Sequence, residues 1–378
     1  MGVVCVRRPR DVRWYLHGWR YSKSSWDIAS SIGSTPRQLQ SLLLSTSSWL
    51  CSWPRRRLCM HAKASPGPAT QPAAGAKKQA LQLPRRRPNT AGYVPGAFAV
   101  PPPVKVPAHI PRPSYANDPH GRPRKLREEE WAEVKGSAAI DRMRDANRLA
   151  AEALALACET AVAGVTTDEV DRRVSEYVIS RGAYPVGINY CGFPRGLCAS
   201  PNEVALHGIP NTRPLEDGDI VSFDVTVFLN NAFGDNCATV CVGDVDEDAR
   251  RLVEVSRQCL LGAIEVVGPG VRLNSVGRFC DRFARERGFG VVSEFCGHFI
   301  GSELHMNPNV LHVPNKQDLE LKPGMTFTIE PILVEGEAKI VGPLDDNWTI
   351  LSHNGGWSAQ WEHTLLITDN GVEILSQA

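Results

Sequence analysis

The stretch that decides the fold is DIVSFDVTVFLNNAFGDNCATV, residues 219–240. Apolar side chains alternate with other residues from Val221 to Val227, a period of two that is typical of a β-strand. Asn230 and Asn231 then supply turn chemistry, and a second strand-like run comes after them. The stretch therefore predicts a β-hairpin.

Two acidic residues, Asp224 and Asp235, lie inside these predicted strands, where aspartate is uncommon. If the turn has two residues, Asp224 lies opposite Cys237, and Asp235 lies on the same face of the hairpin. Two carboxylates on one face repel each other unless a cation lies between them, so this arrangement indicates a metal site. The alternative is that one aspartate faces water. A three-residue loop would have this result, because a shift of one residue in the register moves one aspartate to the other face.

Basic and acidic residues are unevenly distributed along the 378-residue chain, although the net charge is only +1. Before Asp118 the acidic residues are Asp11 and Asp27, whereas Arg and Lys recur throughout that part. Residues 1–60 are also rich in Ser and Trp, and this composition predicts an organelle transit peptide. The alternatives are a tail without structure, an incorrectly assigned start, or a nucleic-acid-binding arm.

Residues 61–125 are rich in Pro, Ala and Gly. Such a segment buries too little apolar surface to offset the entropy of ordering it, so we predict an extended linker. Ile110 and Tyr115 are spaced like anchors that could hold part of it on the next domain. Residues 126–378 contain the periodic helix and strand patterns and are predicted to form the folded domain.

The cysteines and the apolar runs disfavour other classes of protein. The eleven cysteines are an odd number, are scattered, and include no CxxC pair, so neither a disulfide framework nor a zinc finger is expected. Apolar runs such as 42–44 are broken by serines, so no membrane span is predicted. The length is sufficient for a sizeable core, or about two domains.

A helix–turn–helix pattern occurs twice in the predicted domain. One helical pattern starts near Glu128, and a second helix opens at Thr167 and ends at Gly182. About 106 positions later the plan recurs, with helices over 246–267 and 276–283. The matching positions are Val165, Val170 and Gly182 in the first copy and Val271, Val276 and Gly288 in the second. We expect two similar halves around a shared sheet, although two unrelated helical hairpins could also share the pattern.

Further potential ligands interrupt strand-like segments downstream. Glu330 lies in MTFTIEPIL, Glu362 lies in SAQWEHTLL, and His298 lies in CGHFIG. Each residue alone has an ordinary explanation, because a strand glutamate usually faces solvent and a lone histidine is usually hydrogen-bonded. Together with Asp224 and Asp235 they form four carboxylates and one imidazole. This donor set suits a pair of first-row divalent ions held by bridging carboxylates.

The motifs NEVALHGIP, DIVSFDVTVF, FGDN, GHFIG, TIEPIL and SAQWEHT, in this order and at these separations, resemble the type I methionine aminopeptidases. The resemblance covers about Glu128 to the C-terminus. It implies the pita-bread fold, an α+β architecture of two pseudo-symmetric halves around an antiparallel sheet, with a disordered extension before it. Residues 126–378 would then be the catalytic domain. The implied activity is removal of the initiator methionine when the second residue is small.

The resemblance also implies the metal ligands. Asp224 chelates one ion, Asp235 and Glu362 bridge two, and His298 and Glu330 complete one site. The ions expected in the family are cobalt, manganese, iron or zinc, so the identity of the two ions stays open. They would activate a water as the nucleophile.

Catalytic and substrate-binding roles are implied by the same resemblance. Glu330 would move protons, His305 would stabilise the carbonyl oxygen, and His207 would hold the nitrogen of the scissile amide. The walls of a methionine pocket would be Tyr190, Phe193, Cys198, Leu304 and Trp348. Structural hydrogen bonding for the histidines and core packing for the wall residues are the alternatives. A flexible thioether suits such an apolar slot.

One residue departs from the family pattern. Phe299 stands in GHFIG where a glycine is usual, so a positive φ there would be costly. We expect the backbone to adjust, His298 to remain a ligand and the phenyl ring to crowd the rim of the pocket.

Two other functions remain open at the level of sequence. One is an X-Pro dipeptidase or aminopeptidase of the same fold, although such relatives usually carry a folded N-terminal domain. The other is a non-catalytic pita-bread protein that binds ribosomes or RNA, which would not need the complete ligand set. The expected partners are nascent polypeptides with N-terminal methionine and, transiently, the ribosome. We expect a monomer in a chloroplast or mitochondrion, with neither nucleic acid nor a membrane as a partner.

Overall fold

The computed structural model describes residues 93–127 and 130–377. The predicted transit peptide, residues 1–60, and the first part of the predicted linker lie outside the described residues. None of the helices in the described ranges combines the length and the apolar character that a bilayer span requires.

Two pairs of helices are built from the segments with helical periodicity. They are α3 (Ser137–Thr160), α4 (Thr167–Ser180), α5 (Glu247–Glu265) and α6 (Ser275–Glu286), with short 3-10 turns η1 (Ser114–Asn117) and η3 (Tyr190–Gly192). Thr166 and Glu169 form a capping box at the start of α4, and Asp246 accepts the N–H of Ala249 at the start of α5. These local signals fix where α4 and α5 begin. The expectation that the first helix starts near Glu128 is wrong, because α3 begins at Ser137, after Gly136, and has no acidic residue in its first turn.

The strands form one large sheet and one small sheet. The large sheet contains β1 (Tyr184–Pro185), β2 (Cys198–Pro201), β4 (Ile220–Leu229), β5 (Ala232–Cys241), β6 (Phe289–Val291), β7 (Gly297–Phe299), β8 (Met306–Val310), β9 (Thr326–Ile329), β10 (Ile332–Glu335), β13 (Ser358–Ile367) and β14 (Val372–Ile374). Its main path is β1-β4-β5-β13-β9-β7-β8. The small sheet contains β3 (Val204–Leu206), β11 (Ile340–Val341) and β12 (Ile350–Ser352). All of these pairings between described strands are antiparallel.

The hairpin of β4 and β5 has the predicted two-residue turn. Asn230 and Asn231 have φ values of 53° and 59°, the left-handed conformation that asparagine tolerates and that this kind of hairpin turn needs. As a result Asp224 lies opposite Cys237, as expected. Asp235, two residues before Cys237, shares that face of the sheet.

The predicted internal repeat is present in the backbone pairing. An isolated bridge joins Thr166 to Pro214 beside the first helix pair, and another joins Arg272 to Glu320 beside the second. The partners of the two bridges are 106 residues apart in each case. The α+β architecture of two similar halves on an antiparallel sheet is therefore confirmed.

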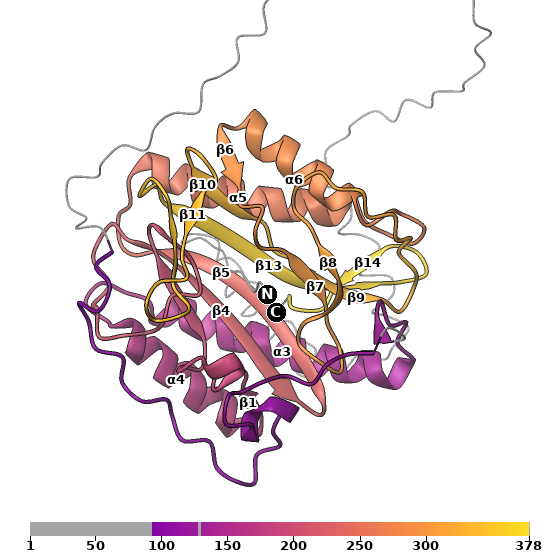
Figure 1. Cartoon of the computed structure of the whole chain (residues 1–378), viewed down its shortest axis with the longest axis horizontal. Coiled ribbons are helices and arrows are strands. Elements are labelled where there is room, and N and C mark those ends of the chain that lie inside the picture. The colour runs from indigo at the N-terminus through magenta and orange to yellow at the C-terminus, as the bar shows by residue number, and fades with distance from the viewer. Residues whose placement is uncertain (1–92, 128–129, 378) are drawn as a thin grey trace, which may run out of the picture. The chain divides into compact units, whose positions relative to one another are not determined.

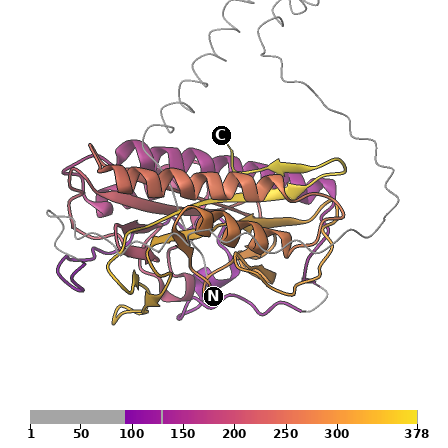
Figure 2. The ribbon, with the colours of Figure 1, turned by 90° about the horizontal axis from the view of Figure 1, so that it is seen from above.

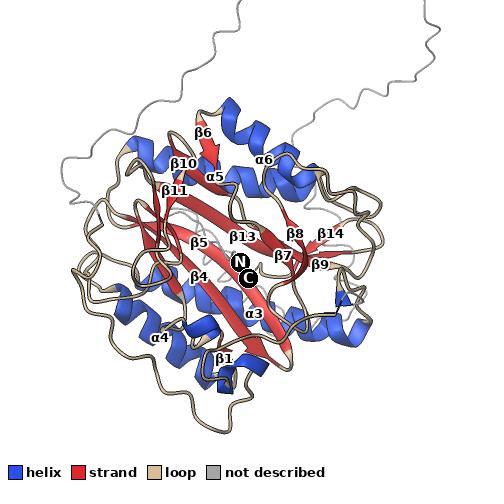
Figure 3. Cartoon of the chain, in the orientation of Figure 1, coloured by secondary structure: helices blue, strands red, loops and turns tan. Residues whose placement is uncertain are grey.

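Helices cover one face of the large sheet. Figure 2 shows α3 and α5 lying along the same side of the strands, and Figure 3 shows the long strands crossing the centre between the helix pairs. Leu149 and Leu252 on these helices belong to one buried cluster with Val225 and Leu365 on the strands. The apolar core thus lies between helices and sheet, which leaves the other face for polar side chains.

Part of the Pro-rich stretch packs on the domain. Residues 99–117, here called the strap, run along its surface, and the N–H of Thr212 donates to the carbonyl oxygen of Ala99. Ile110 and Tyr115 are buried, as their spacing predicted. Because proline has no backbone N–H, the strap has few hydrogen-bond donors of its own. Buried side chains and carbonyl oxygens therefore hold it in place.

Candidate metal centre and substrate pocket

Antiparallel register places the predicted ligands in two rows across the sheet. In the first row Asp224 on β4 lies opposite Cys237 on β5, and Cys237 lies opposite Glu362 on β13. Strands β9 and β10 pair with β13 in one continuous register, which places Glu330, between them, opposite Glu362. Directly opposed residues of neighbouring strands share a face, so these three carboxylates point to the same side.

The second row runs beside the first. Thr226 lies opposite Asp235, and the hydroxyl of Thr364 donates to the carbonyl oxygen of Asp235 at 2.8 Å. Thr328 lies opposite Thr364, and the N–H of His298 donates to the hydroxyl of Thr328 at 3.0 Å. The two rows are two residues apart along β4 and β5, so they share a face. Predicted ligands from four separate strands converge for this reason.

The distances agree with a common centre. Ligand atoms of Asp235, His298 and Glu362 all lie within 4.8 Å of one another, and all three residues are buried. Nε2 of His298 is 3.5 Å from Oδ2 of Asp235 and 3.6 Å from Oε1 of Glu330. Asp224 lies at the edge of this cluster and lines the neighbouring pocket.

The donor atoms fit a cation. Oδ2 of Asp235, Nε2 of His298 and both carboxylate oxygens of Glu362 are buried without a hydrogen-bond partner among the described residues. Burial, and then the charge of Asp235, raises the pKa of Asp224 well above its usual range. Burial, and then the charges of Asp235, Glu330 and Asp224, does the same to the pKa of Glu362. Such groups ionise together only when positive charge lies between them, and oxygen donors with one imidazole suit first-row divalent ions.

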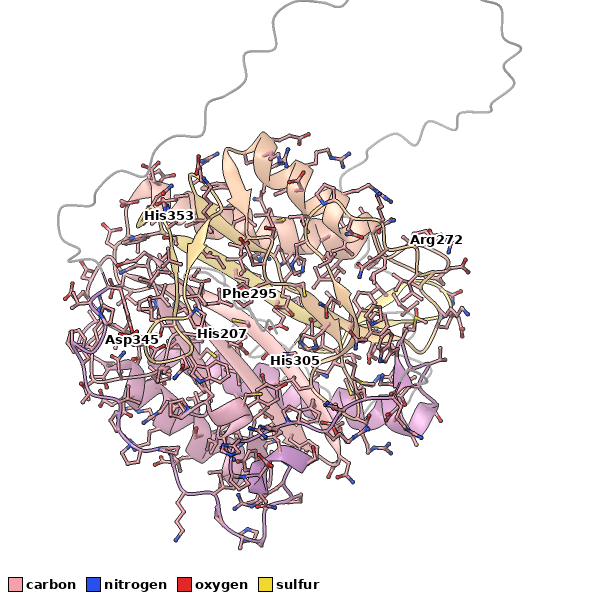
Figure 4. All side chains as sticks on the ribbon, viewed as in Figure 1. His207, Arg272, Phe295, His305, Asp345 and His353 are labelled. Atoms are coloured by element: carbon pink, nitrogen blue, oxygen red, sulfur yellow. The ribbon has the colours of Figure 1, made fainter. Side chains whose placement is uncertain are left out.

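An apolar pocket opens beside this cluster. All seven residues expected to bind substrate line it: Tyr190, Phe193, Cys198, His207, Leu304, His305 and Trp348. In Figure 4, His207, Phe295 and His305 lie near the middle of the view, over the sheet that contains β4 and β5. The pocket and the carboxylates therefore form one continuous candidate site.

The two histidines of the pocket have different surroundings. Nδ1 of His305 lies 2.5 Å from the hydroxyl of Tyr190, and the His305 ring lies edge-on to His298 with a centroid distance of 4.4 Å. Burial, and then the neighbouring histidines, lowers the pKa of His305 well below its usual range. His207 lies between the rings of Trp348 and Phe295, at centroid distances of 5.7 Å and 5.5 Å. Its φ of 55° is strained for a non-glycine residue, as is common at functional sites.

The expectation that Phe299 crowds the pocket rim is wrong. Its side chain is buried in the core and stacks on Phe327 with a centroid distance of 5.5 Å. Neighbouring residues of a strand point to opposite faces, so Phe299 points away from the side that His298 faces. The backbone at Phe299 is part of β7 and has no positive φ, so a side chain is tolerated there.

Four polar residues of the site were missed from the sequence. Thr226 donates to Oδ1 of Asp235 at 2.8 Å, and Thr328 donates to Oε1 of Glu330 at 2.7 Å. The other two are His312, which accepts the N–H of Glu330, and Gln360, whose amide donates to the carbonyl oxygen of Glu330. Thr226, Thr328 and Gln360 each lie two residues from a predicted ligand, so the strand period could have found them. No local signal identifies His312, because it lies 18 residues before Glu330, the residue that it contacts.

Comparison with known proteins gives one family. Residues 141–369 match the metallopeptidase family M24. The chain is 41% identical over 292 residues to the mitochondrial methionine aminopeptidase 1D of Dictyostelium discoideum, an overlap of 76% of this chain and 71% of the relative. It is 43% identical over 272 residues to the chloroplastic/mitochondrial methionine aminopeptidase 1D of Arabidopsis thaliana, an overlap of 72% and 76%.

Solved structures agree with the predicted fold. The methionine aminopeptidase of Rickettsia prowazekii superimposes with a TM-score of 0.64 at 36% identity, over 65% of this chain and 99% of that chain. The prolidase of Pyrococcus furiosus superimposes with a TM-score of 0.53 at 23% identity, over 65% and 66%. The second likeness concerns the fold alone.

Proposed function

Because the chain belongs to the metallopeptidase family M24, we propose that it removes the N-terminal methionine of newly made proteins when the second residue is small. The observation that carries the proposal is the junction of an apolar pocket with a buried cluster of carboxylates and one imidazole. Relatives named methionine aminopeptidase, at 41% and 43% identity, support the same activity.

Five residues would hold two divalent ions: Asp224, Asp235, His298, Glu330 and Glu362. For Asp235, His298 and Glu362, buried oxygen or nitrogen atoms without a hydrogen-bond partner among the described residues support this assignment. When bound, such ions supply Lewis acidity at a carbonyl oxygen and lower the pKa of an attacking water. Cobalt, manganese, iron and zinc all suit the donor set, so we assign no single metal.

The proton-moving and hydrogen-bonding roles fall to three residues. Glu330 is the candidate base and acid, because its carboxylate lies at the centre and is oriented by Thr328. In the tautomer in which Nδ1 of His305 accepts the Tyr190 hydroxyl, a neutral ring carries its proton on Nε2 and can donate to the carbonyl oxygen of the substrate. His207, held between two rings, is positioned to bond the nitrogen of the scissile amide.

The pocket accounts for selectivity toward methionine. Tyr190, Phe193, Cys198, Leu304 and Trp348 surround an apolar slot, and a flexible thioether fills irregular apolar space well. The rings of Phe193 and Trp348 meet edge to face at 5.0 Å, which gives one wall a fixed shape. The preference for a small second residue is taken from the family.

Location and partners are part of the proposal. The relatives from Dictyostelium discoideum and Arabidopsis thaliana are named as mitochondrial and chloroplastic/mitochondrial forms, and this supports an organellar enzyme whose residues 1–60 are a transit peptide. We propose nascent polypeptides as substrates, transient contact with the ribosome, and a monomer. N-terminal sequencing of the protein from isolated organelles tests both parts of this proposal. Absence of the protein from the organelles would contradict the location, and an intact Met1 would contradict the transit peptide.

The activity is tested with short peptides. The purified protein should release methionine from Met-Ala-Ser when manganese is added, should act poorly on Met-Leu-Ser, and should leave Ala-Pro intact. Hydrolysis of Ala-Pro without hydrolysis of Met-Ala-Ser would assign an X-Pro peptidase instead. Binding of ribosomes without hydrolysis of any peptide, with each of the four metals supplied, would favour the non-catalytic alternative.

A further inference from the structure

Arg195 is the largest of the fully buried side chains, with 1% of its surface exposed. It belongs to the segment from Phe193 to Cys198, here called the pocket wall, whose members Phe193, Gly196, Leu197 and Cys198 line the apolar pocket. The side chain of Arg195 does not line the pocket. A guanidinium buried behind a substrate pocket needs an explanation, because burying a charge is costly unless it is fully paired.

Two acidic residues of helix α4 pair with Arg195. Nε and Nη2 both contact Oδ2 of Asp171, at 2.9 Å and 2.7 Å, and Nη2 also contacts Asp168. The other oxygen of Asp171 accepts the N–H groups of Gly196 and Leu197, at 2.8 Å and 3.0 Å. Asp171 therefore holds the backbone of the pocket wall, and Arg195 holds Asp171.

The strap is the third partner. Nη1 of Arg195 donates to the carbonyl oxygens of Pro101 and Pro102, at 2.6 Å and 3.2 Å. Proline has no N–H to offer, so carbonyl oxygens are the polar groups through which these residues can be held. One side chain thus joins the strap, helix α4 and the pocket wall.

The pocket wall has little room to adopt another conformation. A side chain at Gly196 would meet Oγ of Ser175 at 2.1 Å, and one at Gly187 would meet the carbonyl oxygen of Arg195 at 2.6 Å. Burial raises the pKa of Asp171, and the charge of Arg195 opposes that rise. Loss of Arg195 would leave a buried carboxylate without its counter-ion directly behind the pocket.

We propose that Arg195 is a positioning residue that sets the shape of the methionine pocket, and that the strap acts on the pocket through it. The inference rests on the proposed function, because it takes the pocket to be the site of the methionine side chain. A planar fork with five N–H donors can serve two carboxylates and two carbonyl oxygens at once, which the ammonium of lysine cannot.

Kinetics of Arg195→Met and Arg195→Lys test the role in selectivity. In Arg195→Met we expect kcat for Met-Ala-Ser to change by about twofold or less, because the catalytic residues are unchanged. We expect KM to rise about tenfold, because the pocket that binds the methionine side chain has changed shape. The preference for Met-Ala-Ser over Leu-Ala-Ser should fall about tenfold, with a smaller loss in Arg195→Lys. Arg172→Met, which removes an exposed arginine of helix α4, is the matched control and should change nothing. An unchanged preference in Arg195→Met would overturn the proposal.

A second measurement does not depend on activity. Trypsin should cleave after Lys105, in the strap, about tenfold faster in Arg195→Met than in the wild type, because the strap has lost its two hydrogen bonds to Arg195. Equal cleavage rates would overturn the coupling to the strap. Asp168→Asn removes only the partly exposed partner of Arg195 and should change KM, selectivity and the cleavage rate in the same direction but less. It therefore replaces Arg195→Met if that variant does not fold. A wild type that releases no methionine would refute the proposed function, while the cleavage rates would still report on the attachment.

Discussion

The molecule has two halves, residues 137–241 and 247–367, with the same order of helices and strands. They differ in the strand that carries Asp224 in the first half and Glu330 in the second. Each half has a pair of helices on one face of the sheet, and the strands of the site come after them (Figure 1). Asp224 and Glu330 occupy equivalent places in the two halves, with the spacing of 106 residues that also separates the two isolated bridges. The halves differ in the backbone immediately after each carboxylate.

In the first half, β4 continues past Asp224 to the hairpin turn. In the second half, the equivalent strand is interrupted at Glu330 and Pro331, because proline cannot donate to the ladder. His312 accepts the N–H of Glu330 at 3.0 Å and Gln360 donates to its carbonyl oxygen at 2.7 Å, so the break leaves both backbone groups satisfied. The two halves can therefore keep the same helices and the same strand register, although the strand that carries the carboxylate is continuous in one half and interrupted in the other.

The largest effect should come from the equivalent carboxylates. Asp224→Asn and Glu330→Gln should both give folded protein with far less bound metal by elemental analysis, and peptide hydrolysis should fall roughly 10³-fold or more. Excess manganese should restore part of the activity of Asp224→Asn but not of Glu330→Gln, which has also lost its proton carrier. Unchanged metal content in Asp224→Asn would contradict its assignment as a ligand.

His207, which comes directly after β3 in the first half, tests whether this half contributes more than metal ligands. His207→Ala should lower kcat for Met-Ala-Ser roughly 10²-fold, because one hydrogen bond to the reacting amide is lost. Bound metal should stay at the wild-type amount, since no ligand has changed. Near-normal turnover would remove His207 from the mechanism, and loss of metal would make it a ligand instead.

Thr226 and Thr328 hold one carboxylate in each half. Thr226→Val and Thr328→Val should each weaken metal affinity about tenfold, as loss of a group that orients a ligand does. The effect of Thr328→Val should be the larger, because its hydroxyl contacts Glu330 at 2.7 Å and His298 at 3.0 Å. Thr226 contacts Asp235 at 2.8 Å, but its second contact, with Asp224, is longer, at 3.5 Å. Metal titrations followed by calorimetry would measure both. A larger effect of Thr226→Val would show that the first half controls the orientation of the ligands.

The smallest effect concerns stability alone. Gly182 and Gly288 end the second helix of each half with φ values of 76° and 78°, and a side chain would meet no atom within 4 Å at either place. Gly182→Ala and Gly288→Ala should therefore each lower the free energy of unfolding by about 1 kcal/mol, the cost of a left-handed alanine. Denaturant titration would measure the two values. A difference of more than about 1 kcal/mol would show that the two helix ends are not equivalent.

Much of the fold could be predicted because its signals are local. The turn at Asn230 and Asn231 fixes the register of β4 on β5, and that register places Asp224 and Asp235 on one face. The starts of α4 and α5 could be predicted in the same way, because capping residues such as Asp246 act within one turn. The start of α3 could not, because it has no side-chain cap. These features depend on interactions between residues that are close in the chain.

Other parts of the site could not be predicted, because they depend on pairing between distant segments. Phe299 was expected at the pocket rim and is in the core, since the face of β7 is set by its pairing with β9. The role of Arg195 is also invisible in the sequence, because its partners Asp171 and Pro101 are 24 and 94 residues away.

The sequence by itself determined the hairpin, the two helix pairs and which residue types could bind a cation, because period, turn and capping signals act over a few residues. Only the tertiary structure decided that β5, β13, β9 and β7 lie in register, so that Asp235, Glu362 and His298 meet at one centre. Only the tertiary structure fastened the strap behind the pocket as well. Both outcomes have one physical reason: the register between strands that are distant in the chain, and the buried ion pairs, are fixed by burial of the whole domain rather than by neighbouring residues.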